Sequence, residues 1–494
     1  MLFNSYEFII LFLPIVFIIY FTLNRRKYLI AAKVWLTISS LFFYAWWNIY
    51  FLPIICVSIL VNYYFGHLLL VNRSTDRRKR ILTIGICFNV LLLAFFKYID
   101  FFITNLNTVF NVDITLLHIA LPLAISFFTF QQIGYLVDAY YGDINEKSFL
   151  NYTLFVSFFP QLIAGPIIHH KKIMPQFADN RKKFLNSQDI AIGIFIFSIG
   201  LFKKVILADT LAVWATQGFD QLENLSLIEA WITSLSYTLQ LYFDFSGYMD
   251  MATGSALLFN IKLPVNFNSP YKAQNIQDVW NRWHMTLGEF LYRYIYFPIN
   301  RFLLRKVFTP LHMKKFTMLR TNTALMILFL ISGIWHGAGW TFVFWGFLHG
   351  AATIIHRHWK SSNFQMNKYF AWFITFNFLN LSLVFFRANN FSDAIKVLKG
   401  MIGWNGIMLP ERLSTFIPNV WLKYFTIGET PLNDDGRAIK YILVGLLIVL
   451  VFKNSKQLQE KFKPSWYTAL FTIILFIYAI LHLTQESTFL YFNF

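Results

Sequence analysis

The sequence predicts an all-α integral membrane protein, and three observations support this fold class. First, 57% of the 494 residues are hydrophobic and only 13% are charged, whereas soluble domains carry roughly 25% charged residues. Second, apolar stretches near the roughly 20 residues that a membrane-crossing helix needs recur along the chain. Third, the net charge of +18 lies in short clusters between these stretches, as in cytoplasmic loops. These features exclude a soluble domain, a disordered chain and a nucleic-acid-binding protein.

The apolar stretches place the crossings in order along the chain. They cover residues 6–23, 34–71 (two passes, with Asn48 and Pro53 near the bend), 81–99, 115–140, 323–355 (a helix pair), 370–386, 438–452 and 465–485. About twelve crossings are expected in all, and the Lys/Arg bias places both termini on the extracytoplasmic side. We predict one membrane domain, with N-terminal spans in 1–120, a core in 121–356, and C-terminal spans and a tail in 357–494.

One apolar segment is not expected to cross. Residues 151–168 have basic residues on both flanks and contain Pro160, Gly165 and Pro166. Irregular backbone at membrane depth is tolerated only against protein or a wet cavity. We therefore predict a re-entrant segment beside an internal site.

No metal site is predicted. The two cysteines lie in apolar runs. The paired histidines His169/His170 and His356/His358 lie in basic loops, and neither pair has a carboxylate or thiol at ligand spacing.

His336 is the strongest functional candidate. It lies within an apolar stretch, 323–355, that contains no Lys, Arg, Asp or Glu, and an ionisable residue at membrane depth indicates a functional site. Trp335 and Trp340 are expected to wall that site. The alternative is a histidine that only hydrogen-bonds two helices, which is the role expected of His349.

A second polar constellation lies in the basic segment 266–300. Its alternation of tryptophan with charged groups would suit an amphipathic interfacial segment. Its cations could equally attract a phosphorylated ligand. The residues of interest are Lys272, Asp278, Arg282, Trp283, His284 and Arg293.

These two segments together resemble the membrane-bound O-acyltransferase family. DVWNRWHMTLGEF and SGIWHGAGWTFVFWGFLHG carry histidines 52 positions apart. Residues 121–142, 158–167 and 241–254 further resemble the family's bacterial polysaccharide O-acetyltransferase branch.

The resemblance implies a ring of about 10–12 transmembrane helices and re-entrant segments around a central funnel. It implies that His336 is catalytic and that His284 is its companion. In this reading His336 is the general base, His284 orients the donor or polarises its carbonyl, and Trp283 joins Trp335 and Trp340 in the cavity wall.

The resemblance also implies the substrates, partners and location. The donor is a cytosolic thioester, acetyl-CoA, and no bound cofactor is expected. The final acceptor is a cell-envelope polysaccharide such as alginate or peptidoglycan. An extracytoplasmic esterase-like (SGNH) transferase acts as partner, and the enzyme resides in the bacterial cytoplasmic (inner) membrane.

Coenzyme A carries several phosphate charges, for which Arg and Lys are natural partners. The donor-binding candidates are Lys272, Arg282 and Arg293, with Asp278 beside them; the alternative for Arg282 is a structural pair with Asp278. The C-terminal sequence FLYFNF resembles a motif of this branch in which the tyrosine, here Tyr491, relays the acyl group. An aromatic membrane anchor is the alternative for Tyr491.

Two other functional classes remain open from sequence alone. A transporter or channel for a small anionic solute would also use broken helices and a polar residue at mid-membrane. A non-catalytic scaffold for an envelope-modifying complex is the third possibility.

Overall fold

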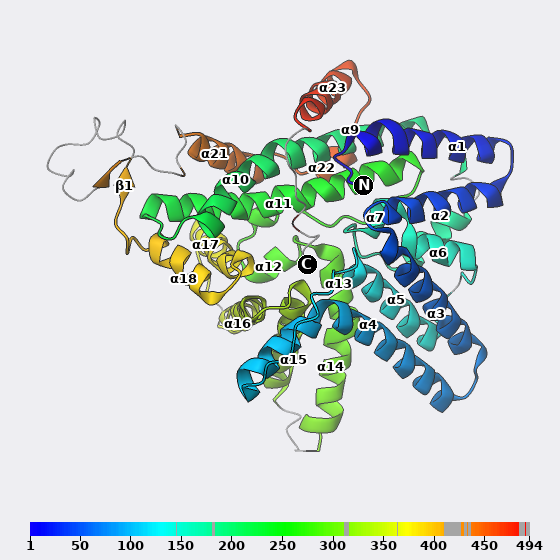
Figure 1. Cartoon of the computed structure of the whole chain (residues 1–494), viewed down its shortest axis with the longest axis horizontal. Coiled ribbons are helices and arrows are strands. Elements are labelled where there is room, and N and C mark those ends of the chain that lie inside the picture. The colour runs from blue at the N-terminus through cyan, green and yellow to red at the C-terminus, as the bar shows by residue number, and fades with distance from the viewer. Residues whose placement is uncertain are drawn as a thin grey trace.

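The computed structural model describes residues 1–144, 146–179, 183–310, 316–362, 364–409, 426–428, 432, 436–483 and 490. Its helices are arranged around the short α12 and α13 (Figure 1). Helices α9, α10 and α11 cross the upper half of that view, α3, α4 and α5 fan out at the right, and α14 and α15 run downward. The ring-like, helical membrane architecture predicted from the sequence is confirmed.

The N-terminal part consists of consecutive helices joined by short turns. Its elements are η1 (Glu7–Phe12), α1 (Leu13–Arg25), α2 (Leu29–Ala45), η2 (Ile49–Phe51), α3 (Leu52–Val71) and α4 (Thr75–Phe110). The bend predicted between the second and third passes is present, and the Asn48 side chain there accepts a hydrogen bond from the Tyr50 N–H at 2.9 Å.

The middle of the chain is more broken. It comprises α5 (Ile125–Tyr141), α6 (Phe149–Ser157), α7 (Phe159–Leu162), α8 (His170–Ala178), α9 (Ser187–Phe202), η4 (Lys203–Ala208), α10 (Asp209–Thr216), η5 (Gln217–Gln221), α11 (Leu227–Leu258), η6 (Pro270–Lys272), α12 (Ile276–Trp280), α13 (Met285–Leu291), η7 (Tyr292–Tyr296), α14 (Phe297–Leu303), η8 (Leu304–Phe308), α15 (Thr317–His336) and α16 (Trp340–Ser361). The predicted re-entrant segment is indeed interrupted, because α6 ends before Phe158 and α7 spans only one turn around Pro160.

The C-terminal part returns to helices around a small strand pair. Its elements are α17 (Lys368–Arg387), α18 (Phe391–Met401), α21 (Arg437–Leu450), α22 (Ser455–Glu460) and α23 (Trp466–Leu481), with the parallel two-residue strands β1 (Met408–Leu409) and β2 (Thr426–Ile427).

Among the described residues, six helical stretches are long and apolar enough to cross a membrane. They are Glu7–Arg25, Ile49–Val71, Thr75–Phe110, Ser187–Gln221, Thr317–His336 and Lys368–Arg387. Two shorter apolar helices, Leu29–Ala45 and Trp466–Leu481, add to them. The stretch predicted at 115–140 starts later than expected, because the chain stays irregular until α5 begins at Ile125.

The α15–α16 hairpin crosses at a pair of glycines. A Cβ on Gly346 would lie 2.4 Å from the carbonyl oxygen of Phe329, and one on Gly333 would lie 2.3 Å from that of Phe342. Backbone atoms cannot yield as a flexible side chain does, so only glycine permits this approach. The crossing lies one helical turn before His336, the last residue of α15.

Gly346→Ala should lower the stability of the protein, because the added methyl group forces the two backbones apart. Overpacking of this kind costs about 1–3 kcal/mol. Gly288→Ala is the matched control, since its Cβ would meet nothing closer than 3.8 Å. The measurement is the thermal unfolding midpoint in detergent; equal midpoints for the two variants would contradict the tight crossing.

Candidate active site

His336 is the last residue of α15 and its side chain is buried. Its ring lies edge-on to three aromatic rings, with centroid distances of 4.9 Å to Trp335, 5.2 Å to Trp345 and 5.1 Å to Phe386. These neighbours come from α15, α16 and α17. The aromatic packing gives the imidazole a defined, water-poor position at the end of the helix.

The end of α15 is held from a distant segment of the chain. Lys97 on α4 donates from Nζ to the carbonyl oxygens of Trp335 and, at 3.3 Å, His336, and lies 3.4 Å from Ser126 Oγ on α5. The neighbouring Tyr98 hydroxyl donates to the Ile334 carbonyl at 2.8 Å. The last carbonyls of a helix have no partner within it and carry partial negative charge. Lys97 and Tyr98 therefore fix the turn that bears His336.

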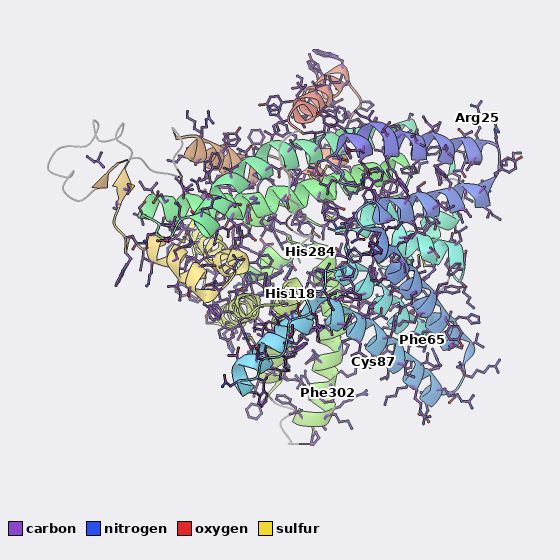
Figure 2. The ribbon with its side chains drawn as sticks, in the orientation of Figure 1. Arg25, Phe65, Cys87, His118, His284 and Phe302 are labelled. Carbon is purple, nitrogen blue, oxygen red and sulfur yellow. The ribbon has the colours of Figure 1, made fainter. Side chains whose placement is uncertain are left out.

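His284 approaches the same region from the other side, near the middle of the molecule (Figure 2). It is buried and caps α13 with a backbone φ of +44°, a left-handed conformation that costs free energy outside glycine. Its ring lies 6.4 Å from that of Trp335 and 4.8 Å from that of Phe245. Trp335 therefore contacts both histidines that the sequence singled out.

Asn266 sets the protonation of His284. Asn266 Oδ1 accepts from the Thr286 N–H at 3.1 Å and hydroxyl at 2.9 Å and lies 3.3 Å from His284 Nδ1. Because this oxygen only accepts, the contact places the ring proton on Nδ1 and the lone pair on Nε2. Burial lowers the pKa of His284 to about 3, so its ring is neutral at physiological pH.

His336 lines a cavity that we term the histidine cavity. Its polar and aromatic lining comes from Tyr271, Trp280, Trp283, His336, Trp345 and His349, and leucine and phenylalanine side chains of α11 and α17 complete it. Trp283 is thus one of the residues that line the same cavity as His336. Trp335 is not among the lining residues, but its ring packs against that of His336.

Trp340 does not line this cavity, and that prediction is wrong. Its side chain is 57% exposed and its indole N–H donates to Asn105 Oδ1 at 2.9 Å. The reason is that α15 ends at His336 and the chain turns through Gly337–Gly339, so Trp340 begins a new helix facing outward. Although Trp340 lies only four positions after His336 in the sequence, the turn between them separates their side chains.

The predicted donor-binding residues separate into two groups. Arg282 Nε lies 2.8 Å from Asp278 Oδ1, an ion pair about one-third exposed. Lys272 lies near this pair. Its pKa is lowered, first by its partial burial and then by the positive charge of Arg282. Neither cation lines the cavity, although each is the chain neighbour of a residue that does, since Lys272 follows Tyr271 and Arg282 precedes Trp283. Lys272 Nζ donates to the Phe452 carbonyl at 2.8 Å.

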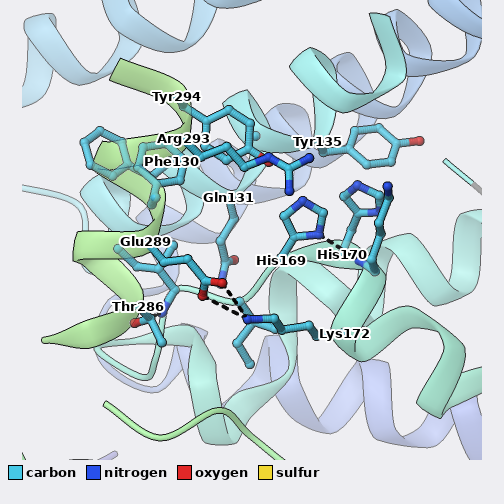
Figure 3. Close-up of a pocket in the computed structure, with 15 residues that line it drawn as sticks. Phe130, Gln131, Tyr135, His169, His170, Lys172, Thr286, Glu289, Arg293 and Tyr294 are labelled. Carbon is cyan, nitrogen blue, oxygen red and sulfur yellow. Dashed lines mark hydrogen bonds and ion pairs between the residues drawn. The ribbon is translucent and has the colours of Figure 1, made fainter. Parts of the chain in front are cut away.

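Arg293 lies instead in a second pocket, which we term the basic pocket. Its polar lining includes His169, His170, Lys171, Lys172, Arg293 and Tyr294. Figure 3 shows His169 and His170 side by side, with Arg293 and the Lys172–Glu289 ion pair in the same pocket. Sequence reasoning did not distinguish this pocket from the Arg282 group.

Asp138 on α5 gives the two histidines the acidic neighbour that the sequence argument did not find. Its Oδ2 lies 2.6 Å from His169 Nε2 and 3.0 Å from His170 Nε2. The three ligand atoms lie within 4.8 Å of one another and could hold a metal ion. However, Arg293 at 3.0 Å and the Tyr294 hydroxyl at 2.8 Å donate to the same carboxylate, which balances its charge within the protein.

Tyr491 lies outside the described residues, but the residue before it does not. The backbone N–H of Leu490 donates to Asp244 Oδ2 at 3.0 Å, and Leu490 packs partly buried against the core. Asp244 is buried on α11 and its other oxygen lies 2.7 Å from Lys204 Nζ. It stands between Leu241, which lines the histidine cavity, and Phe245, which packs on His284.

Comparison with known proteins identifies the family of the chain. The sequence model of MBOAT, the membrane-bound O-acyltransferase family, matches residues 143–299. The chain is 45% identical to a peptidoglycan O-acetyltransferase of Helicobacter pylori, over 100% of this chain and 98% of the relative. It is 31% identical to a probable alginate O-acetylase of Azotobacter vinelandii over the whole of both chains, and 27% identical to a teichoic acid D-alanyltransferase of Bacillus subtilis over 51% of this chain and 61% of that one. The chain is a multi-pass membrane acyltransferase and belongs to the membrane-bound O-acyltransferase family.

Proposed function

We propose that the protein transfers an acetyl group from cytosolic acetyl-CoA across the membrane for O-acetylation of a cell-envelope polysaccharide, peptidoglycan or alginate. One observation carries the proposal: a single cavity has among its lining residues His336 and also Tyr271 and Trp283, the chain neighbours of the cations Lys272 and Arg282. The names of the full-length relatives, a peptidoglycan O-acetyltransferase and a probable alginate O-acetylase, support the acetyl group and the polysaccharide class.

His336 is the general base of the transfer. The acceptor oxygen attacks the thioester carbonyl, its proton passes to His336, the C–S bond breaks and the coenzyme A sulfur leaves as a thiol once it takes a proton. A neutral imidazole suits this task. His284, held neutral by burial and by Asn266 with its ring proton on Nδ1, orients the donor from the far side of Trp335. Because its Nε2 carries a lone pair, it acts there as a hydrogen-bond acceptor and cannot polarise the donor carbonyl.

The donor's phosphates bind Lys272 and Arg282, and its thioester arm extends into the histidine cavity. Arg–phosphate contacts are strong because they are charge-assisted. Asp278 holds the Arg282 guanidinium in place through their 2.8 Å contact. Arg293 is assigned no donor contact, because it lines the basic pocket and not the histidine cavity.

Tyr491 receives the acetyl group before an extracytoplasmic esterase-like (SGNH) transferase takes it to the glycan. The anchoring of Leu490 on Asp244 supports this step, because Asp244 lies within one helical turn of residues that contact the histidine cavity and His284. A phenol with a pKa near 10 is easier to deprotonate than a sugar hydroxyl. The phenyl ester that forms is a reactive onward donor. In this scheme the enzyme sits in the bacterial cytoplasmic membrane with both termini extracytoplasmic.

His336→Ala should reduce acetyl transfer by about 10²–10⁴-fold, which is the usual contribution of a general base. His284→Ala should reduce it less, because the proton acceptor remains. The assay is acetate transfer from labelled acetyl-CoA by purified protein, with the exposed His67→Ala on α3 as control. Normal transfer by a folded His336→Ala variant would rule out this role, and a larger loss in His284→Ala would reverse the two assignments.

Arg282→Ala should raise the KM for acetyl-CoA by roughly tenfold, the cost of losing one charge-assisted hydrogen bond, with a smaller effect on kcat. Arg301→Ala serves as the control, because Arg301 is an exposed arginine of α14, directly after the basic segment 266–300. Steady-state kinetics with varied acetyl-CoA provide the measurement. An unchanged KM would mean that Arg282 only pairs with Asp278.

Tyr491→Phe should abolish polysaccharide acetylation in cells while the protein level stays normal, because the substitution keeps the aromatic ring and removes only the hydroxyl. Tyr467→Phe on α23, another exposed tyrosine near the C-terminus, is the matched control. The readout is the acetyl content of isolated envelope polysaccharide. Wild-type acetylation in Tyr491→Phe would leave the tail with an anchoring role only.

A further inference from the structure

His349 is a buried residue of the histidine cavity to which the transfer chemistry assigns no role. It lies on α16 one helical turn beyond Trp345, and the two ring centroids are 4.5 Å apart. Trp345 in turn contacts His336, and Trp280 lies 5.2 Å from His349. An arm that enters from the Trp280 side and reaches His336 therefore passes His349.

The hydrogen bonds around His349 fix its tautomer. Its Nε2 lies 3.1 Å from Ser382 Oγ on α17. The Ser382 hydroxyl proton is already used, because Ser382 Oγ donates to the Leu379 carbonyl at 2.9 Å. Nε2 must therefore carry the ring proton and donate to Ser382. Nδ1 then holds a lone pair and can only accept.

Two buried side chains that α16 contributes to this cavity have unused hydrogen-bonding capacity. Within the described part of the chain, no hydrogen-bond partner exists for His349 Nδ1 or for the indole N–H of Trp345. Both side chains are more than nine-tenths buried. Leaving a buried donor or acceptor unsatisfied typically costs about 1–3 kcal/mol, so such groups point to a ligand. One of these groups accepts and the other donates, which is the pattern that a secondary amide complements.

We propose that His349 and Trp345 form a binding subsite for an amide of the donor's thioester-bearing arm. The amide N–H donates to His349 Nδ1 and the amide carbonyl accepts from the Trp345 N–H. Acetyl-CoA carries its thioester on an arm with secondary amides, so this subsite rests on the proposed donor. It selects donors that present an amide-containing arm over simple thioesters of the same acyl group.

Two substitutions at His349 separate this binding role from a structural one. Asparagine can place an acceptor near the Nδ1 position but does not reach Ser382, whereas glutamine reaches Ser382 but leaves the Nδ1 position empty. The binding role predicts that His349→Gln raises the KM for acetyl-CoA roughly tenfold and that His349→Asn raises it less. A purely structural role predicts the reverse order, because only glutamine keeps the link to α17.

The experiment compares acetyl-CoA with ethyl thioacetate, an acetyl thioester that has no amide, on the full-length protein in detergent. His349→Gln should raise the KM for acetyl-CoA and leave that for ethyl thioacetate within about twofold, and thermal unfolding identifies any variant that has lost its fold. Equal changes for both donors, the reverse order of the two variants, or an unchanged KM would each overturn the subsite. Absence of acetyl-CoA turnover by the wild-type chain would instead overturn the proposed donor, and the subsite with it.

Discussion

The hydrogen bonds of Lys97 to the end of α15 are the constraint on which the candidate site depends. Lys97 comes from α4, contacts Ser126 at the start of α5, and binds the carbonyls of Trp335 and His336. A helix that ends inside a protein exposes carbonyl groups that water cannot reach, and a lysine among apolar residues is costly unless it has partners. The Lys97 ammonium satisfies the carbonyl groups at the end of α15, and these carbonyls in turn stabilise the buried ammonium. As a result α4, α5 and α15 are held together at the end of α15 that carries His336.

The cavity follows from this fixed point. The α15–α16 crossing at Gly333 and Gly346 brings α16 close enough for Trp345 to contact His336. The buried aromatic rings then enclose one cavity that is lined by His336, His349, Tyr271 and Trp283. The proposed thioester donor is already activated, so its transfer needs mainly alignment and a proton acceptor, the role that we propose for His336.

The sequence predicted most of the helices and the two central histidines, because apolar length, glycine and proline breaks, and an ionisable residue within an apolar stretch are local signals. It failed where side chains from distant segments meet. Asp138 contacts His169 and His170, which lie 31 and 32 residues later in the chain. Trp340 faces outward because the chain turns between the end of α15 and the start of α16. Lys97 was detectable as a lone charge in the apolar part of α4 but was not singled out. The tautomer of His349 depends on Ser382, which no spacing rule indicates.

The central claim is that His336 drives transfer from the thioester onto the chain's own tail. Peptide mapping by mass spectrometry, after brief incubation of purified protein with isotope-labelled acetyl-CoA, tests it most directly. The account predicts a labelled acetyl ester on the C-terminal peptide that contains Tyr491 in the wild-type chain, and its loss in His336→Ala. Equal labelling of that peptide in His336→Ala, or coenzyme A release by the wild-type chain with no label on this peptide, would contradict it.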